Sequence, residues 1–417
     1  QEVYDDPAFR ETLADAVRSL RVGSAWDLSN RIGPLIRPPG GPLRRAIDQL
    51  EPGETWLVEP RMIGDNARLY SPGIKWDVAP GSFTHQTELF GPILGVIPYR
   101  DLAEAIAIVN ATGYGLTSGL QSLDDREQEQ WRESVRAGNL YINRGTTGAI
   151  VLRQPFGGMG ASAFGPGVKT GGPHYVVPLM EITETTPHAD NTSEETLLPE
   201  TLEELLLAAE TLAAAGRLER QHLLRLRLAI RSIARATEDE FNREHDSVRL
   251  LGQDNWRRYL PVPQLRVRLT PRDSLADILI AAAAAVAVDC RAVFSHRDGE
   301  CEESIEWLAT ATESWAGRIE LIEESDQELA DAILAGHVDR IRLLGSEPEP
   351  KIIATACIER FVPCLRRPVV ANGWVELLWF LQEQSVCHDY HRYGNLGRRA
   401  TEPRGELTAP KQQALSE

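Results

Sequence analysis

Cysteine is absent before Cys290 in this 417-residue chain. A thiol nucleophile is therefore excluded from the first half of the sequence. The five cysteines all lie in the second half and include no Cys-x-x-Cys pair. This arrangement is typical of reduced thiols in a cytosolic protein, and it argues against a disulfide framework. The sequence thus favours a cytoplasmic protein.

An excess of positive charge and a long apolar run are also missing. The formal net charge is -17, which argues against nucleic acid and anionic membranes as partners because phosphate binding needs a basic surface. No apolar run approaches the roughly 20 residues that a membrane-spanning helix needs. No signal peptide is visible. We therefore predict neither a nucleic-acid nor a membrane partner for this chain.

The chain begins with Gln1 and not with Met, and its first residues already have the pattern of a folded helix. Apolar side chains recur at helical spacing between residues 8 and 20. We therefore expect a fragment or processed product of a longer protein. Its length fits two or three domains.

The first part of the chain mixes helical and extended patterns. Residues 103–110 predict a helix, and residues 139–143 predict a short strand. Glycine is dense between Gly145 and Gly172, which indicates tight loops. A stretch rich in Thr, Glu, Asp and Asn follows, so residues 183–199 are expected to form a linker.

The second part begins with two amphipathic helices, at residues 202–212 and 223–233. Strand and helix patterns then alternate, which implies a parallel sheet flanked by helices. Strands are expected at 265–269, 290–295, 318–322, 341–344 and 368–371, and helices at 275–286, 302–312, 328–334 and 351–360. This is a Rossmann-like architecture without the Gly-x-Gly-x-x-Gly loop that binds dinucleotides.

Two motifs in the first part could carry chemistry. Residues 88–92 read ELFGP, and a carboxylate beside such a turn could accept two hydrogen bonds from a ribose diol. Residues 143–158 read NRGTTGAIVLRQPFGG, and consecutive backbone N–H groups near Gly148 could form a nest for a carboxylate. Taken alone, Glu88 could be a surface acid, and the glycine-rich run could serve only backbone geometry.

Together the motifs resemble the C-terminal half of an aldehyde dehydrogenase active site. That resemblance implies NAD as cofactor, with Glu88 at its ribose and Phe90 against its nicotinamide ring. The second motif, continued by KTGGPHY at 169–175, resembles the substrate loop of dehydrogenases that oxidise glutamate γ-semialdehyde. The resemblance implies that Gly148 and Ala149 donate backbone hydrogen bonds to the substrate carboxylate, and that Phe156 lines the pocket against the aliphatic stem.

The mechanism of the family is covalent. A thiolate attacks the aldehyde, the adduct gives hydride to NAD, and water activated by a glutamate hydrolyses the thioester. In the family, the nucleophile, the general base and the NAD-binding domain all precede the segment that this chain resembles. The resemblance therefore implies that no catalytic residue lies in this chain, that the nucleophile stands about ten residues upstream of Gln1, and that the chain alone does not turn over.

The second part resembles a further domain of the same superfamily. Residues 338–346 read VDRIRLLGS, similar to a strand and turn of aldehyde dehydrogenase cofactor domains, but Ser295 stands where those domains have a ribose-binding lysine. Residues 265–375 are therefore expected to be architectural. Residues 385–397, SVCHDYHRYGNLG, resemble the C-terminal motif of long bifunctional proline utilization A flavoenzymes, which packs on the partner subunit and closes a substrate tunnel. A homodimer is implied, and FAD is expected only in an upstream proline dehydrogenase domain.

We assign no functional role to several other residues whose side chains could bind a metal or transfer a proton. Zinc could be ligated by Cys387, His388 and His391, but the adjacent Cys-His pair has poor spacing for a tetrahedral ion and a fourth ligand is not evident, so we predict no metal. Structural or surface roles are expected for His85, a loop residue, His174, a hydrogen-bonded histidine, and Arg153, an exposed ion-pair partner.

We therefore expect an α/β fold: the C-terminal, catalytic-domain half of an aldehyde dehydrogenase fold, then a Rossmann-like domain with a parallel sheet. The expected segments are residues 1–182, a linker 183–199, the second domain 200–384, a lid motif 385–397 and a disordered tail 398–417. The expected function is NAD-dependent oxidation of L-glutamate γ-semialdehyde, formed from 1-pyrroline-5-carboxylate, to glutamate in proline catabolism. The alternatives are an aldehyde dehydrogenase for another carboxylated aldehyde, and a non-catalytic assembly or tunnel-lid module.

Overall fold

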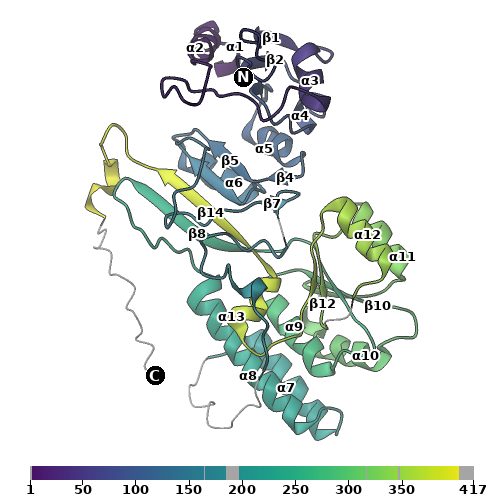
Figure 1. Cartoon of the computed structure of the whole chain (residues 1–417). Coiled ribbons are helices and arrows are strands. Elements are labelled where there is room, and N and C mark those ends of the chain that lie inside the picture. Colours follow the sequence, from purple (N-terminus) through teal and green to yellow (C-terminus); the bar gives the residue numbers. More distant parts are fainter. Residues whose placement is uncertain (1, 164, 185–196, 316, 346–347, 403–417) are drawn as a thin grey trace. The chain divides into compact units, whose positions relative to one another are not determined.

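The computed structural model spans the chain and describes residues 2–163, 165–184, 197–315, 317–345 and 348–402 (Figure 1). Most of the expected linker and most of the expected disordered tail lie outside the described residues. The chain forms two compact units, Gln1–Gly113 with Glu129–Val135, and Tyr114–Gln128 with Arg136–Glu417. Helix α6 (Asp125–Ser134) contains residues of both. These units do not coincide with the predicted domains, whose boundaries remain a prediction.

A three-stranded sheet of order β1-β2-β3 organises the first unit. Strand β2 (Gly73–Trp76) lies between antiparallel β1 (Thr55–Val58) and parallel β3 (Ile93–Gly95). The helices are α1 (Glu2–Asp5), α2 (Pro7–Arg18), α3 (Gly41–Asp48), α4 (Phe83–Gln86) and α5 (Leu102–Asn110). Helices α2 and α5 confirm the two helices predicted near residues 8–20 and 103–110.

Strand β2 uses its two faces differently. Ile74 and Trp76 pack with Ala14 of α2 in a small apolar core. Successive side chains of a strand point to opposite faces, so Lys75 lies on the other face. There its ammonium group pairs with the carboxylate of Glu54 at 2.8 Å, and both side chains are fully buried.

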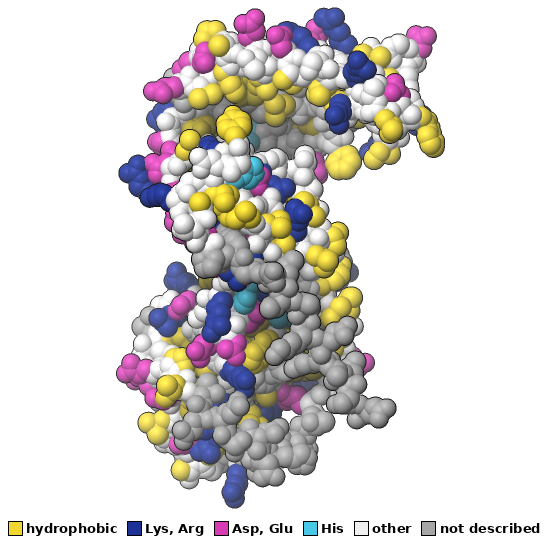
Figure 2. Space-filling view, turned by 90° about the vertical axis from the view of Figure 1, so that its left-hand side faces the viewer, with side chains coloured by type: hydrophobic (Ala, Val, Ile, Leu, Met, Phe, Trp, Pro, Cys, Tyr) yellow, Lys and Arg dark blue, Asp and Glu magenta, His cyan; other side chains and the backbone are white. Residues whose placement is uncertain are grey.

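On the face drawn in Figure 2, acidic and basic side chains are interspersed over the surface of the molecule. Hydrophobic side chains also reach the surface of the first unit. Among the large hydrophobic side chains of this unit in the described part of the chain, Trp26 and Leu28 are the most exposed, at 97% and 94%.

Two sheets organise the second unit. The first has the order β5-β6-β14-β8, in which β5, β6 and β14 run parallel and β8 is antiparallel to β14. Its strands are β5 (Thr117–Leu120), β6 (Asn139–Ile142), β8 (Gln253–Pro261) and β14 (Leu381–Asp389). The last strand of the chain therefore lies between β6 and β8. A short antiparallel pair, β4 (Tyr114–Gly115) and β7 (Met159–Gly160), lies in the same unit.

The second sheet is wholly parallel, with the order β11-β10-β9-β12-β13. Its strands are β9 (Leu265–Arg268), β10 (Ala292–His296), β11 (Ile319–Glu323), β12 (Arg340–Leu343) and β13 (Cys364–Arg366). The α-helices of this unit are α7 (Glu200–Ala214), α8 (Arg220–Ala236), α9 (Leu275–Ala287), α10 (Glu302–Ala311), α11 (Asp326–Leu334), α12 (Lys351–Arg360) and α13 (Gly373–Glu376), and the short 3-10 and π segments are Val177–Leu179, Thr237–Phe241, Glu313–Trp315, Leu377–Trp379 and Gly397–Thr401. The mixed α/β fold with a parallel sheet is as predicted.

One predicted strand is wrong. Residues 368–371 are not a strand, and the fifth strand of the parallel sheet is β13 instead. Pro368 has no N–H to donate to a ladder. The N–H of Val370 donates to the Glu376 carboxylate at 3.1 Å and not to a neighbouring strand.

Helix α9 forms the centre of the second unit's core. Ser274 caps it by accepting a hydrogen bond from the N–H of Asp277. Ten of its thirteen residues are buried, so it is apolar on all sides, as expected for a helix enclosed by others. Helices α7, α8, α10 and α13 contact it. Among the described residues, no helix is both long and apolar enough to cross a bilayer.

Candidate functional site

Glu88 and Phe90 lie in the first unit, on the segment between α4 and β3. Close packing at Gly91 and a backbone hydrogen bond at Pro92 hold this turn in place. A Cβ atom at Gly91 would lie 2.5 Å from Leu43 of α3, and the carbonyl of Pro92 accepts a hydrogen bond from the N–H of Gly73 at 2.9 Å. The Phe90 backbone has a positive φ of 51°, and its ring is 76% exposed. Glu88 is exposed as well. The turn thus holds a carboxylate and an aromatic ring where a ligand can reach them.

His85 is structural. It lies in helix α4, so its prediction as a loop residue is wrong. Its Nδ1 accepts a hydrogen bond from the N–H of Gly81 at 2.8 Å, and its Nε2 lies 2.9 Å from the carbonyl of Ile108 in α5. The two contacts require the tautomer with hydrogen on Nε2. The ring therefore joins α4 to α5.

The predicted substrate residues lie in the second unit, on the irregular segment that follows β6. Gly148 has a φ of 74°, a conformation that glycine adopts without cost. Its carbonyl accepts a hydrogen bond from the Tyr141 hydroxyl at 3.1 Å. Within the described part of the chain, the backbone N–H groups of Gly148 and Ala149 make no hydrogen bond. Two adjacent donors of this kind suit a carboxylate.

The segment beyond this nest turns back at residues 150–154. The N–H groups of Arg153 and Gln154 both donate to the carbonyl of Ile150, at 2.9 and 3.2 Å. Val151 and Leu152 are 85% and 87% exposed, and Leu152 has a positive φ of 68°. Both side chains therefore lie at the surface of the second unit.

Phe156 joins the two glycine-rich motifs. Its N–H donates to the carbonyl of Thr170 at 2.9 Å, and its carbonyl accepts from the N–H of Thr170 at 3.1 Å. The ring is half-buried. Gly148, Ala149 and Phe156 therefore lie on one irregular segment after β6, and Thr170 of the second motif pairs with Phe156. Glu88 and Phe90 belong to the other unit.

Lys169 and Glu383 are buried charges beside this loop that sequence reasoning missed. The Lys169 ammonium group donates to the carbonyl of Gly157, and the Lys169 N–H donates to the Glu383 carboxylate at 3.2 Å. Burial lowers the pKa of Lys169 to about 8 and raises the pKa of Glu383, while each charge favours the other. A lysine inside a glycine-rich motif was a visible signal, but Glu383 had none.

His174 belongs to a second buried network. Its Nε2 lies 3.4 Å from the Glu240 carboxylate, which also accepts hydrogen bonds from Arg257 and, at 2.7 Å, from the Tyr259 hydroxyl. Burial disfavours the Glu240 charge, but the hydrogen bonds from His174, Arg257 and Tyr259 outweigh it and hold the pKa of Glu240 below its usual range. The His174 ring also stacks on Phe241, with ring centroids 5.6 Å apart. A structural role for His174 is consistent with these contacts.

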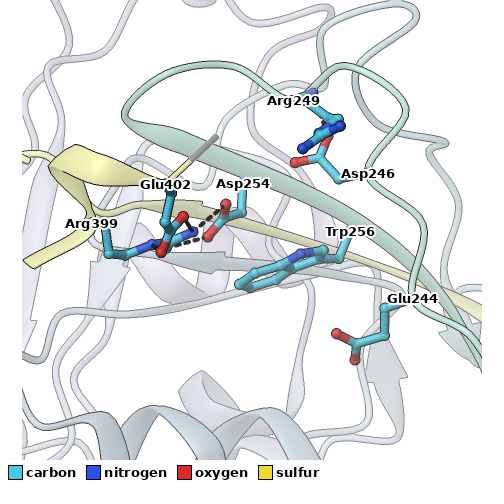
Figure 3. A pocket seen from close by; sticks show the side chains of 7 residues that line it. All are labelled: Glu244, Asp246, Arg249, Asp254, Trp256, Arg399 and Glu402. Atoms are coloured by element: carbon cyan, nitrogen blue, oxygen red, sulfur yellow. Dashed lines mark hydrogen bonds and ion pairs between the residues drawn. The ribbon is translucent and has the colours of Figure 1, made fainter. Parts of the chain in front are cut away.

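A cavity of about 460 Å³ lies where the end of the described chain meets β8 (Figure 3). Its lining residues are Glu244, Asp246, Arg249, Asp254, Trp256, Arg399 and Glu402. Arg399 donates to Asp254 at 2.7 and 2.9 Å and to Glu402 at 2.7 and 2.9 Å, as the dashed lines show. Its guanidinium also lies 3.7 Å above the Tyr390 ring. These contacts fasten Arg399, which follows the C-terminal motif, to β8 of the same chain, so residues 398–402 of the predicted disordered tail are held in place.

The same motif contains the residues considered for zinc. The Cys387 thiol is buried and donates to the Asn255 side chain at 3.3 Å, and burial lowers the pKa of His388. Over the described ranges, no group of three His, Cys, Asp or Glu side chains is placed to hold a metal ion.

Ser295 lies in β10 of the parallel sheet and contacts a charged side chain. The Ser295 side chain is fully buried, and its hydroxyl accepts a hydrogen bond from Arg268 at 3.3 Å. Arg268 also pairs with Asp326 at 2.9 Å, at the N-terminus of α11. Ion pairs and buried hydroxyls thus occupy the carboxyl edge of the sheet, where dinucleotides bind in related architectures.

Comparison with known proteins assigns residues 1–185 to the aldehyde dehydrogenase family model. The chain is 35% identical over 191 residues to a 1-pyrroline-5-carboxylate dehydrogenase of Bacillus subtilis, covering 44% of this chain and 35% of that protein. It is 49% identical over 104 residues to the bifunctional protein PutA of Rhizobium meliloti, covering 24% of this chain and 8% of that protein. The chain therefore spans about a third or less of the curated relatives that it matches.

The fold of nearly the whole chain matches a solved structure. Proline utilization A (PutA) from Corynebacterium freiburgense aligns with a TM-score of 0.73 and 35% sequence identity, covering 94% of this chain and 35% of that one. The likeness extends beyond the family match, so the second unit also has a counterpart there.

Proposed function

We propose that this chain, whose residues 1–185 match the aldehyde dehydrogenase family, is the C-terminal part of an enzyme that oxidises L-glutamate γ-semialdehyde to glutamate with NAD. The observation that carries the proposal is the loop of the second unit. It presents two unbonded backbone N–H groups, at Gly148 and Ala149, and it carries a half-buried aromatic ring, Phe156, on the same segment. Relatives named 1-pyrroline-5-carboxylate dehydrogenase and PutA support the same substrate and a role in proline catabolism.

The loop suits a substrate with a carboxylate at one end. Gly148 and Ala149 would donate to the carboxylate oxygens, and charge-assisted hydrogen bonds of this type are stronger than neutral ones. Phe156 would pack against the aliphatic stem. Because the far end of the substrate is then fixed, its aldehyde carbon is held in one place for attack.

The turn in the first unit suits NAD. The Glu88 carboxylate has two acceptor oxygens for the ribose hydroxyls, and the exposed Phe90 ring offers an apolar face for the nicotinamide. Both are reachable, and the turn that carries them is fixed by Gly91 and Pro92. When bound, the nicotinamide ring supplies the hydride acceptor. The Rossmann-like sheet is not proposed to bind a nucleotide.

The nucleophile is proposed to come from upstream of this chain. Cys290 and Cys387 of the second unit are poorly suited, because burial raises the pKa of Cys290 to about 12 and the pKa of Cys387 to about 11. Neither thiol would form a thiolate near neutral pH. The general base, and a proline dehydrogenase domain with its FAD, are proposed to lie upstream as well. The exposed Trp26, Leu28, Val151 and Leu152 offer apolar surface to that portion. A cytoplasmic homodimer is the proposed assembly.

A substrate panel on the complete protein tests the proposal. Glutamate γ-semialdehyde should exceed an aliphatic aldehyde of equal length in kcat/KM by roughly 10–100-fold, because hydrogen bonds to a charged group contribute about 1.5–3 kcal/mol. A preference for succinate semialdehyde would favour an enzyme for another carboxylated aldehyde. Oxidation of no aldehyde would leave the non-catalytic assembly or tunnel-lid role.

A further inference from the structure

We propose that Lys169 and Glu383, with Ser385, form a clamp through which the last strand of the chain positions the substrate loop. These are positioning residues, since they touch the loop backbone and not the substrate. The inference rests on the proposed function, because it names the groups that hold Phe156 where that function needs it.

The first half of the clamp is Lys169. Its ammonium group is fully buried and donates to the carbonyl of Gly157, which also accepts from the Asn139 side chain at 3.0 Å. The carbonyl directly after Phe156 in the chain is therefore held by a cation and an amide. A Cβ atom at Gly138 would collide with this carbonyl and with the ammonium group, so the space around the contact is closed.

The second half comes from β14. The hydroxyl of Ser385 donates to the carbonyl of Pro155 at 2.6 Å, directly before Phe156 in the chain. The N–H of Ser385 donates to the carbonyl of Gly138 at 2.9 Å, and the Gln384 amide donates to the carbonyl of Ala137 at 2.8 Å. These contacts fix β14 against both the loop and the segment that leads into β6.

Glu383 links the two halves. Its side chain is only 3% exposed, and it accepts a hydrogen bond from the N–H of Lys169. One of its oxygens has no hydrogen-bond partner among the described residues, and a Cβ atom at Gly172 would lie 2.6 Å from that oxygen. A buried carboxylate is costly unless a compensating charge is near, and Lys169 supplies one.

These contacts hold four backbone groups of residues 155–157. The Pro155 carbonyl is held by Ser385, both polar groups of Phe156 are held by Thr170, and the Gly157 carbonyl is held by Lys169. A ring on such a backbone has little freedom to shift. Fixing Phe156 in this way lowers the entropy that substrate binding must remove.

Three variants of the complete protein test the clamp. Lys169→Met removes the donor to Gly157, Glu383→Gln removes the compensating charge, and Ser385→Ala removes the donor to Pro155 with little risk to folding. Each should raise KM for glutamate γ-semialdehyde at least about fivefold while kcat and KM for NAD change less than about twofold. The double variant Lys169→Met with Glu383→Gln removes both charges of this pair. It should regain thermal stability, yet keep the raised KM.

Glu376→Gln is the matched control. Glu376 is a fully buried carboxylate that pairs with Arg342 at 2.9 Å in the same unit. Its loss should lower stability without raising KM. If KM followed stability across the whole set, including the control and the double variant, the residues would be merely structural and the clamp would be refuted.

Amide hydrogen exchange separates this inference from the proposed function. The N–H groups of Phe156 and Thr170 should exchange at least about tenfold faster in the three single variants than in Glu376→Gln, whatever the substrate proves to be. Unchanged exchange would overturn the clamp even in an active enzyme. Faster exchange in a protein that oxidises no semialdehyde would leave the clamp standing and remove only the proposed function.

Discussion

At the scale of single residues, buried charge in the second unit is concentrated where the chain's distant segments meet. Glu240 accepts hydrogen bonds from Arg257, Tyr259 and His174, and Glu383 accepts one from Lys169. Each acid lies beside at least one positively charged or hydrogen-bonding partner from elsewhere in the sequence. Such groups connect stability to pH.

Glu240 gives a prediction about acid stability. Its folded pKa lies below its unfolded value of about 4.3, so its contribution to stability is full above that pH and is lost as pH falls through the folded pKa. Glu240→Gln should lower the unfolding midpoint at pH 7 and flatten the loss of stability below about pH 4.3. Urea unfolding from pH 3 to pH 7 measures both. Glu238→Gln, at an exposed position on the same segment, is the control and should leave the curve unchanged.

Glu88 gives a prediction about the cofactor. Glu88→Ala in the complete protein should lower NAD-dependent kcat/KM by roughly 5–100-fold, since two hydrogen bonds to a charged group contribute on the order of 1–3 kcal/mol together. The melting temperature of the variant should equal that of the unchanged protein, because the Glu88 side chain is exposed. Glu59→Ala changes an exposed acid of the same unit and should leave the kinetics alone. If Glu88→Ala and Glu59→Ala had the same kcat/KM for NAD, Glu88 would not be a cofactor ligand.

The residues of the candidate site were predictable to different degrees. Gly148, Ala149 and Phe156 stood in one contiguous motif, and the structure places them on one loop. Lys169 stood in the second motif, but its burial depends on Gly157 and Glu383, which the sequence does not show to be neighbours. A contact between residues that lie 214 positions apart leaves no local pattern.

At the scale of elements, helix α9 is unusual in having no exposed face. Residues 281–285 are five consecutive alanines, all fully buried. Small side chains allow neighbouring helices, α7 and α8 among them, to approach closely. The packing around α9 therefore has little room for a larger residue.

Ala283→Leu should accordingly destabilise the second unit by about 1–3 kcal/mol, the usual cost of overpacking a core. Denaturant unfolding monitored by circular dichroism is the measurement. Ala214→Leu places the same side chain at an exposed position of α7 and should change stability by less than about 0.5 kcal/mol. A similar loss in both variants would point to helix propensity and not to packing.

In the second unit, helices and strands with a regular spacing of apolar residues were easier to predict than strands that contain many polar residues. Strands β9 to β12 and helices α9 to α12 were predicted because their apolar spacing is clear. Strands β8 and β14 were missed, since the polar residues Arg258, Glu383, Gln384 and Ser385 are buried among their apolar side chains and interrupt the apolar pattern. Arg258 donates to Gln384 across the two strands at 2.8 Å. Polar side chains that satisfy one another give no hydrophobic signal.

At the scale of the whole molecule, β14 lies between β6 and β8, and it is the only strand of that sheet, within the described chain, that pairs with β8. Truncating the complete protein after residue 380 should expose the edges of both neighbours. Unpaired strand edges promote aggregation. Light scattering after size-exclusion chromatography should show aggregates.

A second truncation, after residue 389, isolates the effect of the strand. It keeps β14 and removes the Arg399 contacts with Asp254. This variant should remain as dispersed as the full-length protein. Aggregation of both truncations alike would show that the strand alone does not protect the sheet and that residues 390–417 are needed.

The position of β14 in the sequence also affects how the chain folds while it is being synthesised. The Gln384 amide contacts the carbonyl of Ala137, 247 residues earlier in the chain. At a synthesis rate of about 5–20 residues per second, the ribosome needs roughly 12–50 seconds to add that length. Throughout this interval β6 has been synthesised, but β14, which pairs with it in the folded protein, has not. A newly made chain would thus hold an open strand edge far longer than most folding steps last, and it would depend on chaperones to keep that edge apart from other chains.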